Sequence, residues 1–405
     1  MARTFLFLQG PLSFFFYRLG QALRARGHHV LRVQFCGGDV VYWPERKAKL
    51  WQGPSWMWPQ WIGAFMTDHA VSDLVLLGDW RPLHQEAVLL AKSRGIRVWV
   101  YEEGYLRPGF VTLEAGGVNA SSSLPKSPSA VRKRAEELYS LPPVFPSQAP
   151  NPMPGRVLAT ICHHVGNFFL WPLFFRYKTH RPYCIGRELT GLLPRYFLRN
   201  VRRRNSINVL RDVLKREDPL YFMPLQLDSD SQIRRHSPFT GVLDSLSVVI
   251  TSFAAHAPSS SYLLIKNHPL DNGLINYRRY IRSMGLAAGC ASRLRFVEDV
   301  NNASFLERCQ AVVLCNSTLG LSALVHGLPV YCLGSSIYAM PGLAAGPSEM
   351  PLESFWKEPR LPERGLVEDF LLVLKHDALV PGNFYSEEGI REAIQASLLR
   401  LEAVS

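Results

Sequence analysis

Three groups of polar residues follow short apolar runs of this sequence, and their side chains could do chemistry. Glu102 and Glu103 follow the apolar run 98–101, and Asp228 and Asp230 follow the run 220–225. The third group contains residues that often bind phosphate, namely Lys266, His268, Asn316, Ser317, Thr318 and Gly320. Because residues beyond the carboxyl ends of parallel strands line the ligand crevice of an open α/β sheet, we expect these groups at binding sites.

The four carboxylates have several possible roles. Asp228 and Asp230 would share one face of an extended segment but would diverge on a turn, so they fit a nucleophile, a base, a metal pair or a solvated turn. Glu102 and Glu103 are adjacent, so one could raise the pKa of the other and keep it protonated as a general acid. The alternative is that one of them caps a turn or pairs with Arg107.

The third group suits a phosphate. Asn316, Ser317 and Thr318 open a predicted helix, where an N-cap and unpaired amides favour an anion, although a simple capped helix explains them equally well. Lys266 and His268 could neutralise a phosphate or a leaving group. Other loops that follow apolar runs could position a sugar or an acceptor, and they contain Gln9, Gly10, Asp39 and Gln226.

Alternating strands and helices must position these loops. The apolar runs predicted as strands are 4–8, 30–35, 73–77 and 98–101, then 220–225, 261–265, 294–297, 311–315 and 330–333. The segments predicted as helices are 14–26, 83–94, 240–256, 274–284, 302–308 and 318–327, with one or two more in 366–403. This alternation indicates parallel sheets joined by right-handed crossovers.

The chain length of 405 residues favours two domains. The proline-rich connector 142–155 marks a change in composition, and we place the segment 156–204 with the first domain. We therefore predict an N-terminal domain over 1–205, a nucleotide-donor domain over 206–365, and terminal helices over 366–405 that could pack back across the domains.

The net charge of +12 fits a nucleic acid, an anionic membrane or an acidic substrate. No nucleic-acid-binding motif is recognisable, so we expect no nucleic acid partner. The segment 156–204 combines many aromatic residues with the basic run 199–204, which suits a membrane interface, although a helix packed on its own domain is an equal alternative. Seven cysteines without a close pair indicate reduced thiols. We expect a cytoplasmic protein that is peripheral to the inner membrane.

The ordered set of motifs resembles the capsule polysaccharide biosynthesis and export family, specifically the KpsS-like β-Kdo glycosyltransferases. The residues that carry this resemblance are 8–11, 14–15, 37–39, 102–108, 226–230, 268–269 and 316–324. The resemblance implies a GT-B-like α/β fold, with two Rossmann-like doubly wound domains facing a central cleft. It also implies a retaining transfer of Kdo from CMP-Kdo to lysophosphatidylglycerol at the inner membrane.

By this resemblance, Asp230 is the nucleophile and Asp228 the alternative, while Glu102 and Glu103 supply acid/base or acceptor-positioning groups. His268, Ser317 and Thr318 would hold the CMP phosphate, and an arginine such as Arg107 or Arg234 would pair with the Kdo carboxylate. Related sequences often have Glu-Asp in place of Glu102-Glu103. We expect no metal or other cofactor, and other capsule assembly proteins as further partners.

Two other functions are compatible with the sequence. One is a non-catalytic export factor that binds the polysaccharide, and the other is a GT-B transferase that uses another nucleotide sugar. A binding protein would not need a carboxylate such as Asp230 opposite a phosphate site, so that residue separates the first alternative from an enzyme.

Overall fold

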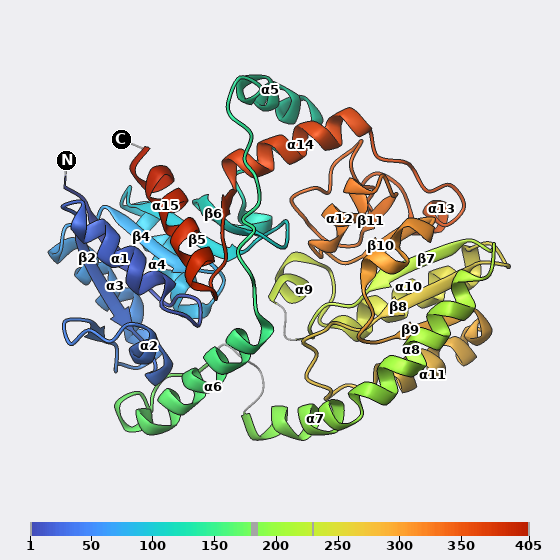
Figure 1. The fold of residues 1–405 in the computed structure, drawn as a ribbon, viewed down its shortest axis with the longest axis horizontal. Coiled ribbons are helices and arrows are strands. Elements are labelled where there is room, and N and C mark those ends of the chain that lie inside the picture. The colour runs from blue at the N-terminus through green and yellow to red at the C-terminus, as the bar shows by residue number, and fades with distance from the viewer. Residues whose placement is uncertain (1, 180–184, 229–230, 404–405) are drawn as a thin grey trace. The chain divides into compact units, whose positions relative to one another are not determined.

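The computed structural model describes residues 2–179, 185–228 and 231–403. The chain forms two compact units (Figure 1). The first contains residues 1–124, 137–180 and 372–405, and the second contains residues 125–136 and 181–371. The domain limits predicted from the sequence, and the cleft predicted between the two halves, stay predictions.

The first unit is built on a seven-stranded sheet in the order β12-β6-β5-β4-β1-β2-β3. Its strands are β1 (Thr4–Phe7), β2 (His29–Gln34), β3 (Lys49–Leu50), β4 (Asp73–Leu77), β5 (Arg97–Glu103), β6 (Phe110–Ala115) and β12 (Leu379–Pro381). The first five strands in the chain are parallel, while β6 runs antiparallel to β5, and β12 antiparallel to β6. All four strands predicted for this half are present, but β5 is longer than expected and includes both Glu102 and Glu103.

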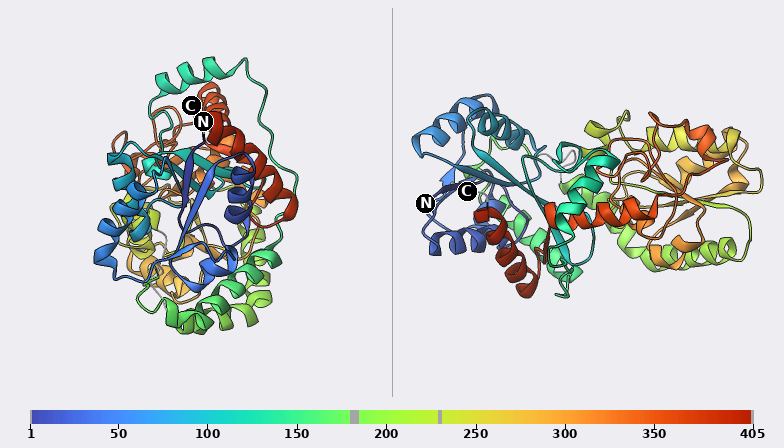
Figure 2. Two further views of the ribbon diagram at one scale, coloured as in Figure 1. Left: turned by 90° about the vertical axis from the view of Figure 1, so that its left-hand side faces the viewer. Right: turned by 90° about the horizontal axis from the view of Figure 1, so that it is seen from above.

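Helices cover both faces of the first sheet because its strands are apolar on both sides. On one face Phe5 and Phe7 pack with α1 (Phe15–Ala25) and α15 (Glu387–Ala403). On the other face Leu6 and Leu8 pack with α3 (Trp58–Asp68) and α4 (Pro82–Ser93). The two ends of the chain lie side by side in this unit (Figure 2), where Arg3 Nη1 donates to the carbonyl of Leu401 at 2.6 Å.

Two more helices of the first unit matter for function. The short helix α2 (Gly37–Tyr42) follows β2, and α6 (Met153–Phe169) packs against it. The crossing is close because a Cβ on Gly37 would overlap the carbonyl oxygen of Gly166. The 3₁₀ turn η3 (Trp171–Leu173) follows α6.

The second unit is built on a parallel sheet of five strands in the order β11-β10-β7-β8-β9. Its strands are β7 (Leu220–Pro224), β8 (Tyr262–Lys266), β9 (Leu294–Val297), β10 (Ala311–Leu314) and β11 (Val330–Cys332), all of which the sequence predicted. One face packs against α10 (Val242–His256), α11 (Tyr277–Ala287) and α13 (Leu352–Phe355). The other helices assigned here are α7 (Ile185–Phe197), α8 (Arg199–Leu214), α9 (Ser231–His236) and α12 (Leu319–Val325).

Some predicted elements differ from those observed. The segment 302–308 forms two 3₁₀ turns, η5 (Asn302–Ser304) and η6 (Leu306–Arg308), in place of one helix. The C-terminal segment forms α14 (Arg364–Asp377) and α15 with strand β12 between them, and a further helix, α5 (Pro128–Leu138), precedes the proline-rich connector. Of the helices that the structure describes, none has the length and apolar character needed to cross a membrane.

The two sheets have the same strand order. Numbered within each unit, the parallel strands run 3-2-1-4-5, the order of a Rossmann-like half. The strand order therefore reverses between β1 and β4 in the first unit, and between β7 and β10 in the second. An open α/β sheet binds its ligand at such a switch point. The strand order of the two sheets confirms the predicted α/β fold with two Rossmann-like units.

Candidate functional site

Gln9 and Asp39 form a buried network at the switch point of the first sheet. Gln9 Nε2 donates to Asp39 Oδ2 at 3.3 Å, and Arg81 Nη1 donates to Gln9 Oε1 at 2.9 Å. Asp39 Oδ2 also accepts from the Phe35 amide at 2.9 Å. Both side chains are only 5% exposed. This network ties together the loops that follow β1, β2 and β4.

Gly10 is needed for packing at the same edge, since a Cβ there would overlap the Phe16 ring. The predicted role of Gln9, Gly10 and Asp39 in holding a sugar or an acceptor stays a prediction. The structure gives these three residues a structural role, because their contacts hold the loops after β1 and β2 in shape.

Glu102 and Glu103 lie in β5 and not beyond it, and successive residues of a strand point to opposite faces. Glu103 forms an ion pair with Arg156 of α6 and accepts from the Tyr385 hydroxyl at 3.2 Å. Glu102 accepts from the Glu103 amide at 3.1 Å and lies on the side of Gly78, the residue after β4. The two carboxylates therefore do not form the shared acid pair expected from their adjacency. Arg107, the predicted partner of one of them, is exposed.

Gln226 and Asn316 join the two strand ends at the switch point of the second sheet. Gln226 Nε2 donates to Asn316 Oδ1 at 3.0 Å, and the Asn316 amide donates to Gln226 Oε1 at 3.2 Å. These reciprocal hydrogen bonds hold the loop after β7 beside the loop after β10. The side chains predicted to position and bind the substrate are thereby brought to one place, although their roles stay predictions.

Asp228 follows β7 and contacts the first turn of α10. Its Oδ1 accepts from the Val242 amide at 3.3 Å, and its Oδ2 lies 3.6 Å from Arg234 Nη2. An acidic side chain at the start of a helix is stabilised by the unpaired amides and the helix dipole. These contacts give Asp228 a structural role. The predicted nucleophile, Asp230, lies outside the described residues.

Lys266 is the last residue of β8, the strand next to β7, and His268 follows this strand. Lys266 is 7% exposed, and burial lowers the pKa of its ammonium group, an effect that nearby Asp299 opposes. His268 Nδ1 accepts from the Leu270 amide at 3.1 Å, so the neutral ring carries its hydrogen on Nε2. That nitrogen is therefore a hydrogen-bond donor.

A buried ion pair supports the loop that carries His268. Arg195 of α7 pairs with Asp271 at 2.8 Å and donates to the carbonyls of His268 and Pro269 at 3.1 Å and 3.3 Å. Both charged side chains are at least nine-tenths buried. The guanidinium thus fixes the backbone on either side of Pro269.

Ser317, Thr318 and Gly320 follow β10 on the other side of β7. Ser317 Oγ accepts from the Leu319 amide at 3.2 Å, and the Ser317 carbonyl accepts from the Tyr338 hydroxyl. A Cβ on Gly320 would overlap the Tyr338 hydroxyl, so the glycine is explained by this close packing. The predicted binding groups thus follow three adjacent strands, β8, β7 and β10.

Comparison with known proteins shows the family of this chain. The model of a family described as capsule polysaccharide biosynthesis protein matches residues 72–385. The chain belongs to this family. The resemblance expected from the sequence motifs is therefore confirmed.

Two relatives align with this chain over nearly their whole length. The capsule polysaccharide export protein KpsS of Escherichia coli is 34% identical over 370 residues, which cover 91% of this chain and 93% of KpsS. The capsule polysaccharide modification protein LipB of Neisseria meningitidis serogroup A is 31% identical over 405 residues, which cover 95% of this chain and 92% of LipB. A solved structure, Thermosulfurimonas dismutans KpsC, described as a β-Kdo 2,7 transferase, aligns over 99% of this chain and 100% of its own with 14% identity and a TM-score of 0.44.

Two buried carboxyl groups of this family member were missed by sequence reasoning. Glu114 of β6 is 2% exposed and accepts from the Tyr105 hydroxyl at 2.7 Å and from Ser122. Burial raises the pKa of Glu114 to about 7, and the charge of Asp79 adds to this shift. Burial also raises the pKa of Asp79, the second residue after β4, whose Oδ2 accepts from the Val118 amide at 3.3 Å.

Each of these two residues left a signal in the sequence. Glu114 interrupts the apolar run that begins at Phe110, and Asp79 follows an apolar strand just as Asp228 does. Such positions indicate a buried carboxyl group or a strand-end loop.

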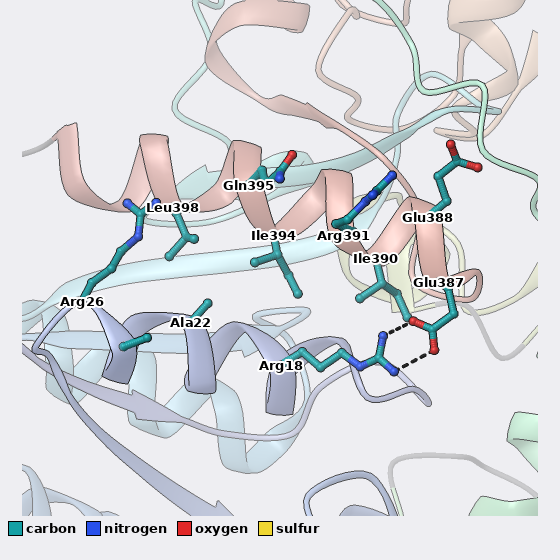
Figure 3. A pocket seen from close by; sticks show the side chains of 11 residues that line it. Arg18, Ala22, Arg26, Glu387, Glu388, Ile390, Arg391, Ile394, Gln395 and Leu398 are labelled. Carbon is teal, nitrogen blue, oxygen red and sulfur yellow. Dashed lines mark hydrogen bonds and ion pairs between the residues drawn. The ribbon is translucent and has the colours of Figure 1, made fainter.

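The described residues of the first unit also form an apolar groove between α1 and α15 (Figure 3). Ala22, Ile394 and Leu398 line it, and the ion pair of Arg18 with Glu387 lies at one end. None of the predicted site residues lines this groove. Within residues 2–179, 185–228 and 231–403, no three His, Cys, Asp or Glu side chains are grouped to hold a metal ion. The expected absence of a metal stays a prediction.

Proposed function

We propose that this protein is a retaining glycosyltransferase that moves Kdo from CMP-Kdo to lysophosphatidylglycerol in capsule assembly. One observation carries the proposal. In a member of the capsule polysaccharide biosynthesis family, a lysine and a histidine at the end of β8 and two hydroxyl side chains after β10 flank β7 in one Rossmann-like sheet, and two glutamates end a strand of the other. The relatives KpsS and LipB are named as a capsule polysaccharide export protein and a capsule polysaccharide modification protein, which supports a role in capsule assembly.

The second unit binds the donor in this proposal. The Nε2 hydrogen of His268, the Lys266 ammonium group, and the hydroxyls of Ser317 and Thr318 contact the CMP phosphate. Charge-assisted hydrogen bonds of this kind stabilise the negative charge that the leaving group gains. No metal or other cofactor takes part in the proposed reaction.

The proposed reaction is a double displacement. The Asp230 carboxylate attacks the anomeric carbon of Kdo, and the bond from that carbon to the phosphate oxygen breaks, so its electron pair leaves with CMP. A hydroxyl of the acceptor then loses its proton to a base and attacks the same carbon, which releases Asp230. We assign Asp230 and not Asp228 as the nucleophile, because Asp228 caps α10 and lies beside Arg234.

Glu102 is the proposed base for the acceptor hydroxyl. Glu103 is the less suitable choice because its Oε1 already contacts Arg156 and accepts from Tyr385. The Kdo carboxylate would pair with an exposed arginine, Arg107 or Arg234. A lipid acceptor places the protein at the cytoplasmic face of the inner membrane, where other capsule assembly proteins would be partners.

The test uses the intact protein with CMP-Kdo, with and without lysophosphatidylglycerol. We expect release of CMP and a lipid product heavier by one Kdo, and in the absence of acceptor we expect a covalent Kdo adduct by intact-protein mass spectrometry. Asp230→Ala should abolish both, while Asp228→Asn should leave the adduct detectable. An Asp230→Ala protein that transfers Kdo at the normal rate would refute the nucleophile assignment.

The same assay separates the other functions. A polysaccharide-binding export factor would release no CMP with any acceptor, yet would bind the polymer. A transferase for another nucleotide sugar would be inhibited by UDP, whereas the proposed enzyme should be inhibited by CMP and not by UDP.

A further inference from the structure

Helix α6 of the first unit presents one face to the protein and an apolar face to solvent. On the inner face, Asn167 Oδ1 accepts from the Gly38 amide at 2.7 Å, and the Ala159 carbonyl accepts from the Tyr42 hydroxyl at 2.5 Å. Gly166 is the point of close contact with α2. These contacts show which side of α6 packs against α2 (Figure 1).

The outer face is apolar along its whole length. Val157, Leu158, Ile161, Val165, Phe168 and Phe169 are 48–76% exposed. They recur three or four residues apart, so they form one stripe along the helix. Trp171 and Phe175 continue this stripe beyond α6, with exposures of 64% and 58%. A contiguous apolar surface of this kind marks a binding site for another surface.

The charges around this stripe identify what it binds. The sequence contains no Asp or Glu from residue 138 to residue 187, whereas Arg176 and Lys178 follow the aromatic end of α6 and are exposed. The Arg176 guanidinium lies 5.1 Å from the centre of the Phe175 ring. Aromatic rings next to cations, in a stretch of sequence without acidic residues, are complementary to anionic lipid headgroups above an acyl layer.

We propose that the outer face of α6, with residues 171–178, binds the surface of an anionic lipid bilayer. The apolar stripe lies among the upper acyl chains, the rings of Trp171 and Phe175 lie at headgroup depth, and Arg176 and Lys178 contact lipid phosphates. In the basic run of α8, Arg202 lies 3.5 Å from the buried Glu298, and the membrane role that the sequence suggested for this run stays a prediction.

The same helix reaches the candidate site. Arg156, in the first turn of α6, forms the ion pair with Glu103 at the end of β5, and its guanidinium lies 4.4 Å from the centre of the Tyr385 ring. A bilayer bound along α6 would therefore lie next to the edge of the sheet that carries the proposed base. This deepens and rests on the proposed function, since a lipid acceptor could then be reached without leaving the bilayer.

The test is flotation of the full-length protein with vesicles of phosphatidylcholine containing phosphatidylglycerol. The protein should float with these vesicles, and Ile161→Glu/Val165→Glu should reduce the bound fraction by at least about ten-fold, because charges are costly at acyl depth. The matched control is Leu399→Glu, which changes a 71% exposed leucine on α15 of the same unit and should bind as the wild type does. Arg176→Gln/Lys178→Gln should weaken binding and make the remaining binding less sensitive to salt.

Several outcomes would overturn the proposal. They are a wild-type protein that stays with the soluble fraction, an Ile161→Glu/Val165→Glu variant that floats normally, and a Leu399→Glu variant that loses binding equally. Thermal melting of each variant shows whether it is folded. Release of CMP with monomeric short-chain acceptor, measured without vesicles, separates this inference from the proposed function. We expect the Ile161→Glu/Val165→Glu variant to keep that activity. A wild-type protein that floats with the vesicles but releases no CMP would count against the catalytic proposal alone.

Discussion

The two Rossmann-like sheets have the same strand order, but the two units treat a buried carboxyl group in opposite ways. In the first unit Glu114 is buried with neutral hydroxyl partners from Tyr105 and Ser122, and its pKa is raised to about 7. In the second unit Asp271 is equally buried but is paired with Arg195 at 2.8 Å. The first unit thus keeps a carboxyl group whose pKa is raised to about 7, and the second keeps a charge fixed by an ion pair.

The difference shows that the fold supplies the place of a site and the strand-end side chains supply its chemistry. Each sheet brings its loops together at a switch point, through Gln9 in the first unit and the Gln226–Asn316 pair in the second. The first edge then offers acidic groups, which suit proton transfer. The second offers Lys266 and His268, which suit an anion. The variants below test this division.

The largest effect is expected at the acidic edge. Glu102→Gln should lower the turnover number for Kdo transfer by about 10²- to 10⁴-fold, because the acceptor hydroxyl loses its general base. Inhibition by CMP should not change, since the donor contacts lie in the other unit. Both values come from steady-state assays of CMP release.

Glu103→Gln is the matched control for this variant. It keeps an oxygen that can accept from Arg156 and Tyr385, so it should have the smaller effect. The reverse order of the two variants would transfer the role of base to Glu103.

The second effect concerns the fixed charge of the other edge. Arg195→Leu should lower the free energy of unfolding of the second unit by about 3–5 kcal/mol, because it leaves the Asp271 carboxylate buried without its cation. Denaturant titration monitored by circular dichroism measures this change. Adding Asp271→Asn should restore part of the loss, and a single variant as stable as the wild type would contradict the buried-pair interpretation.

Most of the strands could be predicted from the sequence, because buried parallel strands leave largely apolar runs, and the predicted segments 73–77 and 294–297 match β4 and β9 residue for residue. Strand β12 could not. It has three residues, and its place beside β6 depends on a pairing between residues 379–381 and 110–112, far apart in the chain. A short edge strand of this kind is too short to show a hydrophobic pattern from which it could be predicted.

The candidate site was predicted in part for a similar reason. Alternating strands and helices place the loops after β7, β8 and β10 together, so their convergence follows from the sequence. The partners of each side chain do not follow from it. The capping of α10 by Asp228 and the pairing of Glu103 with Arg156 join segments 14 and 53 residues apart.

A smaller effect is expected for the donor side. Lys266→Met should raise the KM for CMP-Kdo, and the inhibition constant of CMP, by about 10- to 100-fold, because one charge-assisted hydrogen bond to the phosphate is lost. The turnover number at saturating donor should change much less than in Glu102→Gln. Equal losses in turnover and affinity would show that Lys266 also acts in the chemical step, which would blur the division between the two edges.

The last effect concerns the titrating group buried in the first unit. Because the pKa of Glu114 rises from 4.5 to about 7 on folding, the folded protein holds this proton over a range where the unfolded chain has lost it. Its stabilising contribution is therefore complete below pH 4.5 and is lost as the pH rises through about 7. Glu114→Gln keeps an uncharged acceptor at this position, so at pH 8 it should be more stable than the wild type by up to about 3 kcal/mol, with little difference at pH 4.5. Thermal unfolding of both proteins between pH 4.5 and 8 measures this gap, and two curves that stay parallel over that range would show that Glu114 is not the titrating group.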